Sequence, residues 1–95
     1  MRLDLFLKLA RIVKRRTQAK EMCDEGVVKV NGKKAKAAKE ISENDVIEID
    51  TISKYIKFKV VKVPSTKNVS KKESKELIEI LEEKRKDLKN IIDLL

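Results

Sequence analysis

Hydrophobic residues near the start of the chain recur at intervals of three and four positions. They are Leu3, Phe6, Leu7, Ala10 and Val13. This spacing places them on one face of an α-helix, so we predict a first helix that turns an apolar face toward a core. A short second helix is predicted to follow, with Thr17 as its N-cap and Gly26 as the left-handed residue that ends it.

The hydrophobic period then changes to two, which is typical of strands with one buried face. Val28 and Val30 alternate with Lys29 and lead into Asn31-Gly32, the dipeptide that favours a two-residue hairpin turn. Further strands are predicted at residues 46–50 and 55–63.

In the last of these strands, Val60 and Val61 are adjacent. Either a bulge shifts the register there or both faces of the strand are covered, and the pattern does not decide between them.

The last quarter of the chain has a helical pattern again. Ser70 followed by Glu73 fits a capping box at a helix start. Hydrophobic residues continue at four- and three-residue spacing as Leu77, Leu81, Leu88, Ile91 and Leu95. We predict an amphipathic helix over residues 70–95 whose apolar stripe docks on its own domain or, as the alternative, pairs with a partner helix.

These elements predict an α+β fold for a chain of 95 residues, which has room for one modest core. Two N-terminal helices pack on a small antiparallel sheet, and a C-terminal amphipathic helix follows. The predicted organisation is a domain at 1–63, a linker at 64–69 and the helix at 70–95.

Positive charge is concentrated in the first half of the chain. The protein has 24 Lys and Arg against 16 Asp and Glu, a formal net charge of +8. Residues 1–40 contain 12 basic and 5 acidic residues, a net charge of +7. We therefore expect any polyanion-binding surface in the first half.

Three consecutive cations, Lys14, Arg15 and Arg16, lie where the two predicted helices meet. One cation would suffice to offset the negative end of a helix dipole, an effect of about 0.3–1 kcal/mol. Three adjacent cations repel each other unless a polyanion neutralises them, so we favour nucleic-acid binding over a purely helix-stabilising role. Arginine also suits bidentate contact with phosphate.

Catalytic and metal chemistry have few candidates. The chain has no His and a single Cys, so it cannot form a Cys-His or Ser-His pair, a familiar zinc cluster or an internal disulfide. Its two glycines, Gly26 and Gly32, do not form a phosphate-binding loop. We predict a protein that is not an enzyme and uses no cofactor, metal or small-molecule substrate.

The sequence has no secretory signal or bilayer-spanning apolar segment, so we expect a cytoplasmic protein without a membrane partner.

The order of several residues resembles the RNA-binding domain named after small-subunit ribosomal protein S-four. The matching positions are Arg2-Leu3-Asp4, Leu7, Arg16, Ala19, Lys20, Gly26, Val28, Val30, Asn31-Gly32-Lys33 and Asp45-Val46-Ile47. In that family two packed helices lead into a small antiparallel sheet, and the helices and following hairpin bind folded RNA. Two positions depart from the usual pattern: Arg15 stands in place of a serine, and Glu43-Asn44 in place of Pro-Gly. Asn44 still suits a turn because asparagine tolerates left-handed geometry.

The charge clustering and the resemblance together predict an RNA-binding surface. It comprises Arg2, Lys8, Arg11, Lys14, Arg15, Arg16, Thr17, Lys20, Asn31, Lys33 and Lys36. The resemblance implies that Arg2 and Arg16 are the key contacts.

The run RLDLFLKLARIVKRRTQAKE resembles more specifically the small stand-alone bacterial branch that acts in ribosome-associated quality control. This implies binding to ribosomal RNA and tRNA on obstructed large ribosomal subunits. A quality-control factor that elongates the stalled chain is a further expected partner, and the expected state is a monomer. The heat-shock ribosome-recycling proteins are a sister branch and remain an alternative, although this chain lacks their strongly basic tail.

Two other classes of function remain open. The C-terminal stripe would suit a protein-interaction adaptor, in which the basic face only keeps the protein soluble. DNA binding is a third possibility, because attraction to phosphate alone does not distinguish the two nucleic acids.

Overall fold

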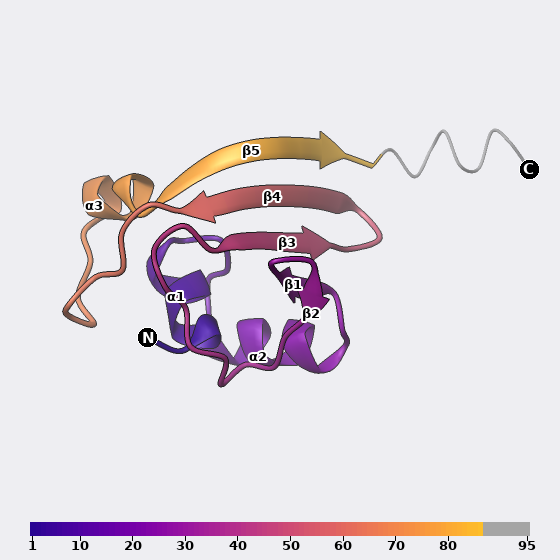
Figure 1. Cartoon of the computed structure of the whole chain (residues 1–95), viewed down its shortest axis with the longest axis horizontal. Helices are drawn as coiled ribbons and strands as arrows, with labels where there is room; N and C mark the ends of the chain where they lie inside the picture. The colour runs from indigo at the N-terminus through magenta and orange to yellow at the C-terminus, as the bar shows by residue number, and fades with distance from the viewer. Residues whose placement is uncertain (87–95) are drawn as a thin grey trace, which may run out of the picture.

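The computed structural model describes residues 1–86 and shows an antiparallel sheet with the first two helices packed against it (Figure 1). The helices are α1 (Leu3–Leu9), α2 (Arg16–Asp24) and α3 (Lys71–Glu76). The strands are β1 (Val28–Val30), β2 (Lys33–Lys34), β3 (Val46–Asp50), β4 (Lys54–Val60) and β5 (Ile78–Arg85). Their order in the sheet is β2-β1-β3-β4-β5, and every neighbouring pair is antiparallel.

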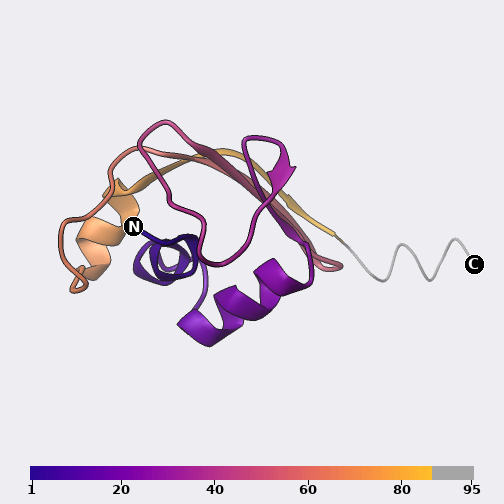
Figure 2. The ribbon, with the colours of Figure 1, turned by 60° about the horizontal axis from the view of Figure 1, so that its bottom comes forward.

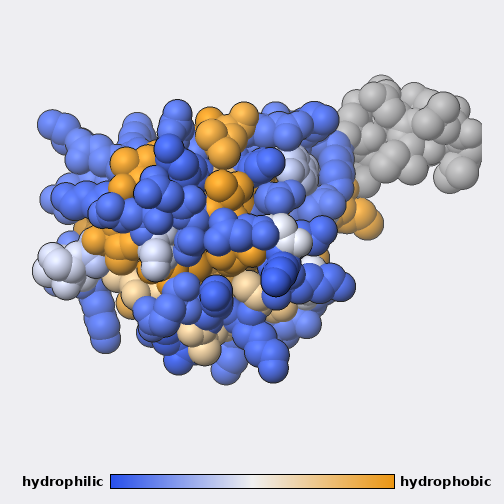
Figure 3. Space-filling view, in the orientation of Figure 1, coloured by the Kyte–Doolittle hydropathy of each residue, from blue (hydrophilic) through white to orange (hydrophobic). Residues whose placement is uncertain are grey.

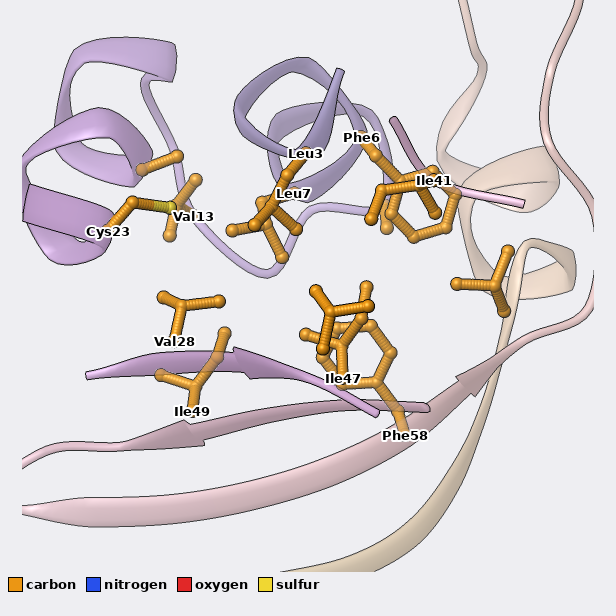
Figure 4. Close-up of a cluster of buried hydrophobic side chains, with 14 of the residues drawn as sticks. Leu3, Phe6, Leu7, Val13, Cys23, Val28, Ile41, Ile47, Ile49 and Phe58 are labelled. Carbon is orange, nitrogen blue, oxygen red and sulfur yellow. The ribbon is translucent and has the colours of Figure 1, made fainter. Parts of the chain in front are cut away.

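Helices α1 and α2 lie on the concave face of the curved sheet, and α3 lies beyond one end of it (Figure 2). The core fills the space between these layers. Leu3, Phe6 and Leu7 of α1 point toward Ile47 and Phe58 of the sheet (Figure 4), and all five are completely buried. The predicted α+β arrangement of two N-terminal helices on an antiparallel sheet is therefore confirmed.

The turn predictions are also confirmed. Asn31 and Gly32 both have positive φ angles, 52° and 83°, as a two-residue turn between β1 and β2 requires. Gly26 follows α2 with a φ of 76°, and a side chain there would have to adopt a rare conformation. Asn44 has a φ of 73° in the turn before β3.

The first two helices differ in detail from the prediction. Helix α1 ends at Leu9, and Arg11 then takes a φ of 60°, which no helix continues. Val13 is buried nevertheless, because the loop after α1 folds back onto the core. The predicted N-cap at Thr17 is wrong: α2 begins at Arg16, and its N-cap Arg15 makes no side-chain capping hydrogen bond.

Strand β4 resolves the question of the adjacent valines by ending at Val60. Val60 is completely buried, whereas Val61 is 45% exposed and outside the strand. The register shift of this sheet lies in the pairing of β4 with β5. There Lys57 pairs with Glu82 and Phe58 with Ile80.

The predicted C-terminal helix is wrong for residues 78–85. Ser70 does cap a helix, since its Oγ accepts a hydrogen bond from the Glu73 amide at 3.1 Å, but α3 ends at Glu76. Leu77 is buried in the core, and Leu81 lies in strand β5, where it is 48% exposed. They do not share a helical face, and Leu88, Ile91 and Leu95 lie outside the described residues.

The open edge of β4 explains this difference. Strand β3 covers one side of β4. Without a second neighbour, β4 would leave unpaired backbone groups along its other side, and β5 pairs with it there from Lys54 to Val60. Opposite charges also face each other across the pair: Lys54 Nζ lies 2.9 Å from Glu83 Oε1. Helical spacing in the sequence is thus overridden by strand pairing.

No helix within residues 1–86 is long and apolar enough to cross a membrane. In the same residues no cluster of three or more Cys, Asp or Glu side chains is arranged to hold a metal ion.

Candidate nucleic-acid interface

The corner between α1 and α2 is organised around one buried carboxylate. Asp4 is 2% exposed and contacts two arginines that are far apart in the sequence. The Nε of Arg16 donates a hydrogen bond to Asp4 Oδ2 at 3.1 Å, and the Nε of Arg2 lies 3.3 Å from Asp4 Oδ1. The amide of Leu5 donates to the same Oδ1 at 2.8 Å.

Local structure brings these groups together. Arg2 immediately precedes α1 and is held by an isolated bridge to Glu40. Asp4 is in the first turn of α1, where a negative charge is favoured by the helix dipole. Arg16 is the first residue of α2, so the packing of the two helices sets its distance from Asp4.

This arrangement orients both arginine side chains and leaves them accessible to a ligand. Their side chains remain 46% and 40% exposed, against 3% for Asp4. Arg16 uses its Nε for Asp4, so its two terminal nitrogens remain free to bind a ligand. With two guanidinium groups and one carboxylate, the corner retains a net positive charge, which suits a bidentate phosphate contact.

The other predicted cations of the first half form no ion pair within residues 1–86. They are Lys8, Arg11, Lys14, Arg15, Lys20, Lys33 and Lys36, and all are exposed. The paired strands β4 and β5 are different, because Lys54, Lys59 and Lys84 each pair with a glutamate. Within residues 1–86, ten of the twelve Lys and Arg residues of the first 40 positions lack an ion pair, against seven of the eleven that follow.

Several of these side chains gather around two separate hollows. Lys8, Arg11 and Lys14 line one of about 690 Å³. Asn31, Lys33 and Lys36 line a second, of about 630 Å³. Arg15, Thr17 and Lys20 belong to neither and are exposed at α2. Hydrophilic residues dominate the face seen in Figure 3, with smaller hydrophobic areas between them.

The side chain of Asn31 is largely engaged within the fold. Its Oδ1 accepts a hydrogen bond from the Val46 amide at 2.9 Å, and its Nδ2 donates to Asp45 at 3.1 Å. These bonds tie the hairpin turn to the start of β3. Asn31 thereby holds the lysines of β2 in place, and one N–H of its side-chain amide has no partner within residues 1–86.

The sequence prediction missed three residues of the candidate interface. Lys34 and Lys39 line the second hollow beside the predicted Lys33 and Lys36. Asp4 was recognised as part of the family motif but not as the partner of both arginines. A single acid among cations in the first helix is a signal for such a role, although only the packing shows which cations it meets.

The single thiol does not contribute reactive chemistry. Cys23 is buried against the core, and its burial, with the charges of Asp4 and Asp24 nearby, raises the pKa of the thiol to about 11. The thiolate is therefore scarce at neutral pH.

Comparison with known proteins agrees with this geometry. A family model described as the S4 domain matches residues 1–47. The RQC P-site tRNA stabilizing factor of Streptococcus pneumoniae is 45% identical over 90% of this chain and 94% of its own length. That of Bacillus subtilis is 36% identical over 90% of this chain and 96% of its own.

Two solved structures have the same fold. The solution structure of the hypothetical protein HP1423 has a TM-score of 0.74 at 36% identity and covers 92% of this chain and 100% of its own. Heat shock protein 15 of Vibrio cholerae, described as trimeric, has a TM-score of 0.75 and covers 98% of this chain and 87% of its own. Its sequence identity is 24%, so this likeness concerns the fold alone.

Helices α1 and α2, the β1–β2 hairpin and the Arg2–Asp4–Arg16 corner define an S4-domain RNA-binding protein. The identity and coverage of its relatives are more specific than that class. The chain belongs to the family of RQC P-site tRNA stabilizing factors, which act in ribosome-associated quality control.

Proposed function

We propose that this protein binds ribosomal RNA and the P-site tRNA on obstructed large ribosomal subunits, and that it stabilises the tRNA there while the stalled chain is extended. The observation that carries the proposal is the pairing of Arg2 and Arg16 on Asp4 in a chain that matches its relatives over nine-tenths of its length. The protein acts by binding, without catalysis.

In this proposal the Arg2–Asp4–Arg16 corner makes the specific contacts with RNA. Arg2 and Arg16 are prepositioned, so little side-chain entropy is lost when they bind phosphate. The unpaired lysines around the two hollows add attraction that does not depend on sequence. RNA of defined shape is therefore bound through its backbone, since the three aromatic residues offer no stacking platform. Phe6 and Phe58 are buried in the core, and Tyr55 is half-buried with its hydroxyl bonded to Glu48.

The predicted extent of the RNA-binding unit, residues 1–63, is part of this proposal, as is a monomeric state. A quality-control factor that elongates the stalled chain would then meet this protein on the ribosome, where both bind the RNA.

The test is sedimentation with purified large subunits that carry peptidyl-tRNA. Arg16→Ala should abolish co-sedimentation, while the matched Arg85→Ala, which removes an exposed cation from β5, should retain it. Equal co-sedimentation of both variants would contradict the proposal. Far-UV circular dichroism of both variants checks that the fold is intact.

The recycling and adaptor alternatives are less well supported. The likeness to heat shock protein 15 shows only the fold, and the adaptor required a helical stripe that includes Leu77 and Leu81. Leu77 is instead 2% exposed in the core, so it cannot contact a partner.

A further inference from the structure

The hollow beside α1 has a wall that the S4 motif does not supply. One side is formed by the end of α1 and the loop after it, which provide Lys8, Arg11 and Lys14. The other side is formed by residues 67–70, which lie well beyond the matched residues 1–47. This second wall adds another cation, Lys67.

The path of the chain explains why these cations meet. Arg11 adopts a φ of 60°, a left-handed conformation that residues other than glycine adopt uncommonly. Its amide donates to the carbonyl of Lys8 at 3.0 Å, and this tight turn returns Lys14 to the same hollow as Lys8.

The charges around the hollow are poorly balanced. None of the four cations has a carboxylate oxygen within 4.0 Å among the described residues. Glu73 is the single acid in the lining, which leaves an excess of three positive charges. Cations gathered on facing walls repel each other, and this repulsion is relieved when a polyanion enters between them.

The shape and surface of the hollow are also suitable for a ligand. Its volume of about 690 Å³ lies within the range of roughly 300–1,000 Å³ that is usual for ligand sites. Leu9 and Val13 form apolar parts of its lining, against which a ribose can pack while the cations contact phosphate.

We propose that this hollow is a second binding site for the ribose-phosphate backbone of RNA, in which Lys67 faces Lys8 and Lys14 across the bound strand. The inference rests on the proposed function and extends it to the segment predicted as a linker. The Arg2–Asp4–Arg16 corner and this hollow then bind two stretches of backbone, and residues 67–70 contribute directly to affinity.

The experiment measures the affinity of the full chain for a tRNA transcript by fluorescence anisotropy at several salt concentrations. Lys67→Glu should weaken binding at 0.1 M salt by roughly tenfold and lower the slope of log affinity against log salt by about one, as expected for the loss of a phosphate contact. Lys72→Glu is the matched control, because Lys72 is an exposed lysine of α3 outside the lining. It makes the same change in net charge and should weaken binding by less than about threefold.

A second variant tests whether removing a negative charge from the hollow strengthens RNA binding. Glu73→Gln removes the only acid from the lining and keeps the backbone amide that Ser70 caps, so it should tighten binding by about two- to fivefold. Lys67→Ala repeats the first test without introducing an acid. Urea denaturation of each variant confirms that the fold is unchanged.

The outcomes separate this inference from the proposed function. If the unmodified protein binds tRNA but Lys67→Glu and Lys72→Glu bind equally well, the second site is overturned and the proposed function stands. If the unmodified protein binds neither tRNA nor large subunits, both are overturned.

Discussion

The Nε of Arg16 donates a hydrogen bond to the buried Oδ2 of Asp4 at 3.1 Å, across the interface between α1 and α2. A carboxylate that is 3% exposed would be costly without a partner. Arg16 supplies that partner and, in return, its guanidinium is held in one orientation at the protein surface. One ion pair thus links the stability of the helical pair to the geometry of the proposed RNA contact.

Asp4→Asn tests whether Asp4 positions the arginines. Removing a negative charge raises the net charge of the protein, and if attraction to phosphate alone mattered, affinity for RNA would increase. We expect instead that affinity falls by about three- to tenfold, because Arg2 and Arg16 lose their common anchor and must be ordered on binding. Stability should fall by about 1–3 kcal/mol, since the amide of asparagine offers Arg2 and Arg16 one acceptor oxygen instead of two and no negative charge.

These effects are measured by anisotropy with a tRNA transcript and by urea denaturation. Glu40→Gln is the control, because it removes an exposed acid that pairs only with the N-terminal amine. Tighter binding by both variants would exclude a positioning role for Asp4.

Substitution of Asn31 should destabilise the hairpin. Asn31→Ala loses both side-chain hydrogen bonds and places alanine at a φ of 52°, so we expect a loss of about 2 kcal/mol in the free energy of unfolding. Asn31→Gly relieves the backbone strain but not the lost bonds and should cost about 1 kcal/mol. Chemical denaturation of both variants checks this order, and an equal cost would mean that the φ angle is unimportant.

Leu77 and Leu81 should differ sharply when each is replaced by alanine. Leu77→Ala leaves a cavity in the core and should cost about 2–4 kcal/mol. Leu81→Ala changes a residue that is 48% exposed on the edge strand and should cost less than about 1 kcal/mol. On the apolar face of one helix, the two replacements would cost a similar amount of stability. Nearly equal changes in urea midpoint would therefore contradict the strand assignment of β5.

The thiol of Cys23 should react slowly in the folded protein. A pKa of about 11, raised from 9.0 mainly by burial, lowers the thiolate fraction at pH 8 by roughly a hundredfold, and burial hinders access further. Iodoacetamide labelling followed by mass spectrometry measures the rate. Labelling in urea should restore the rate of an ordinary thiol, and rapid labelling of the native protein would contradict the buried position.

The same shift affects stability at high pH. The folded-state pKa of Cys23 lies above the value of 9.0 in an unfolded chain, so the unfolded state binds fewer protons between these values. This contribution to stability is therefore complete below pH 9 and is lost as pH rises toward 11. Comparing urea midpoints of the unmodified protein and Cys23→Ala over this range isolates it from the titration of lysines.

Features that depend on neighbouring residues can be predicted from the sequence. The spacing of Leu3, Phe6 and Leu7 predicts the buried face of α1, and Asn31-Gly32 predicts a turn because few other dipeptides accept two positive φ angles. The concentration of charge in residues 1–40 likewise needs no structure. These are local properties of the chain, and the packing leaves them unchanged.

Features that depend on distant partners cannot be predicted in this way, because they follow from the packing of the folded chain. Residues 78–85 have helical spacing, yet they form β5 because the edge of β4 offers backbone hydrogen bonds along its whole length. The pairing of Arg2 and Arg16 with Asp4, and the position of Lys67, Lys8 and Lys14 around one hollow, depend on how separate segments pack. A one-dimensional pattern records which side chains are present, but the distances between them follow from the way the core is filled.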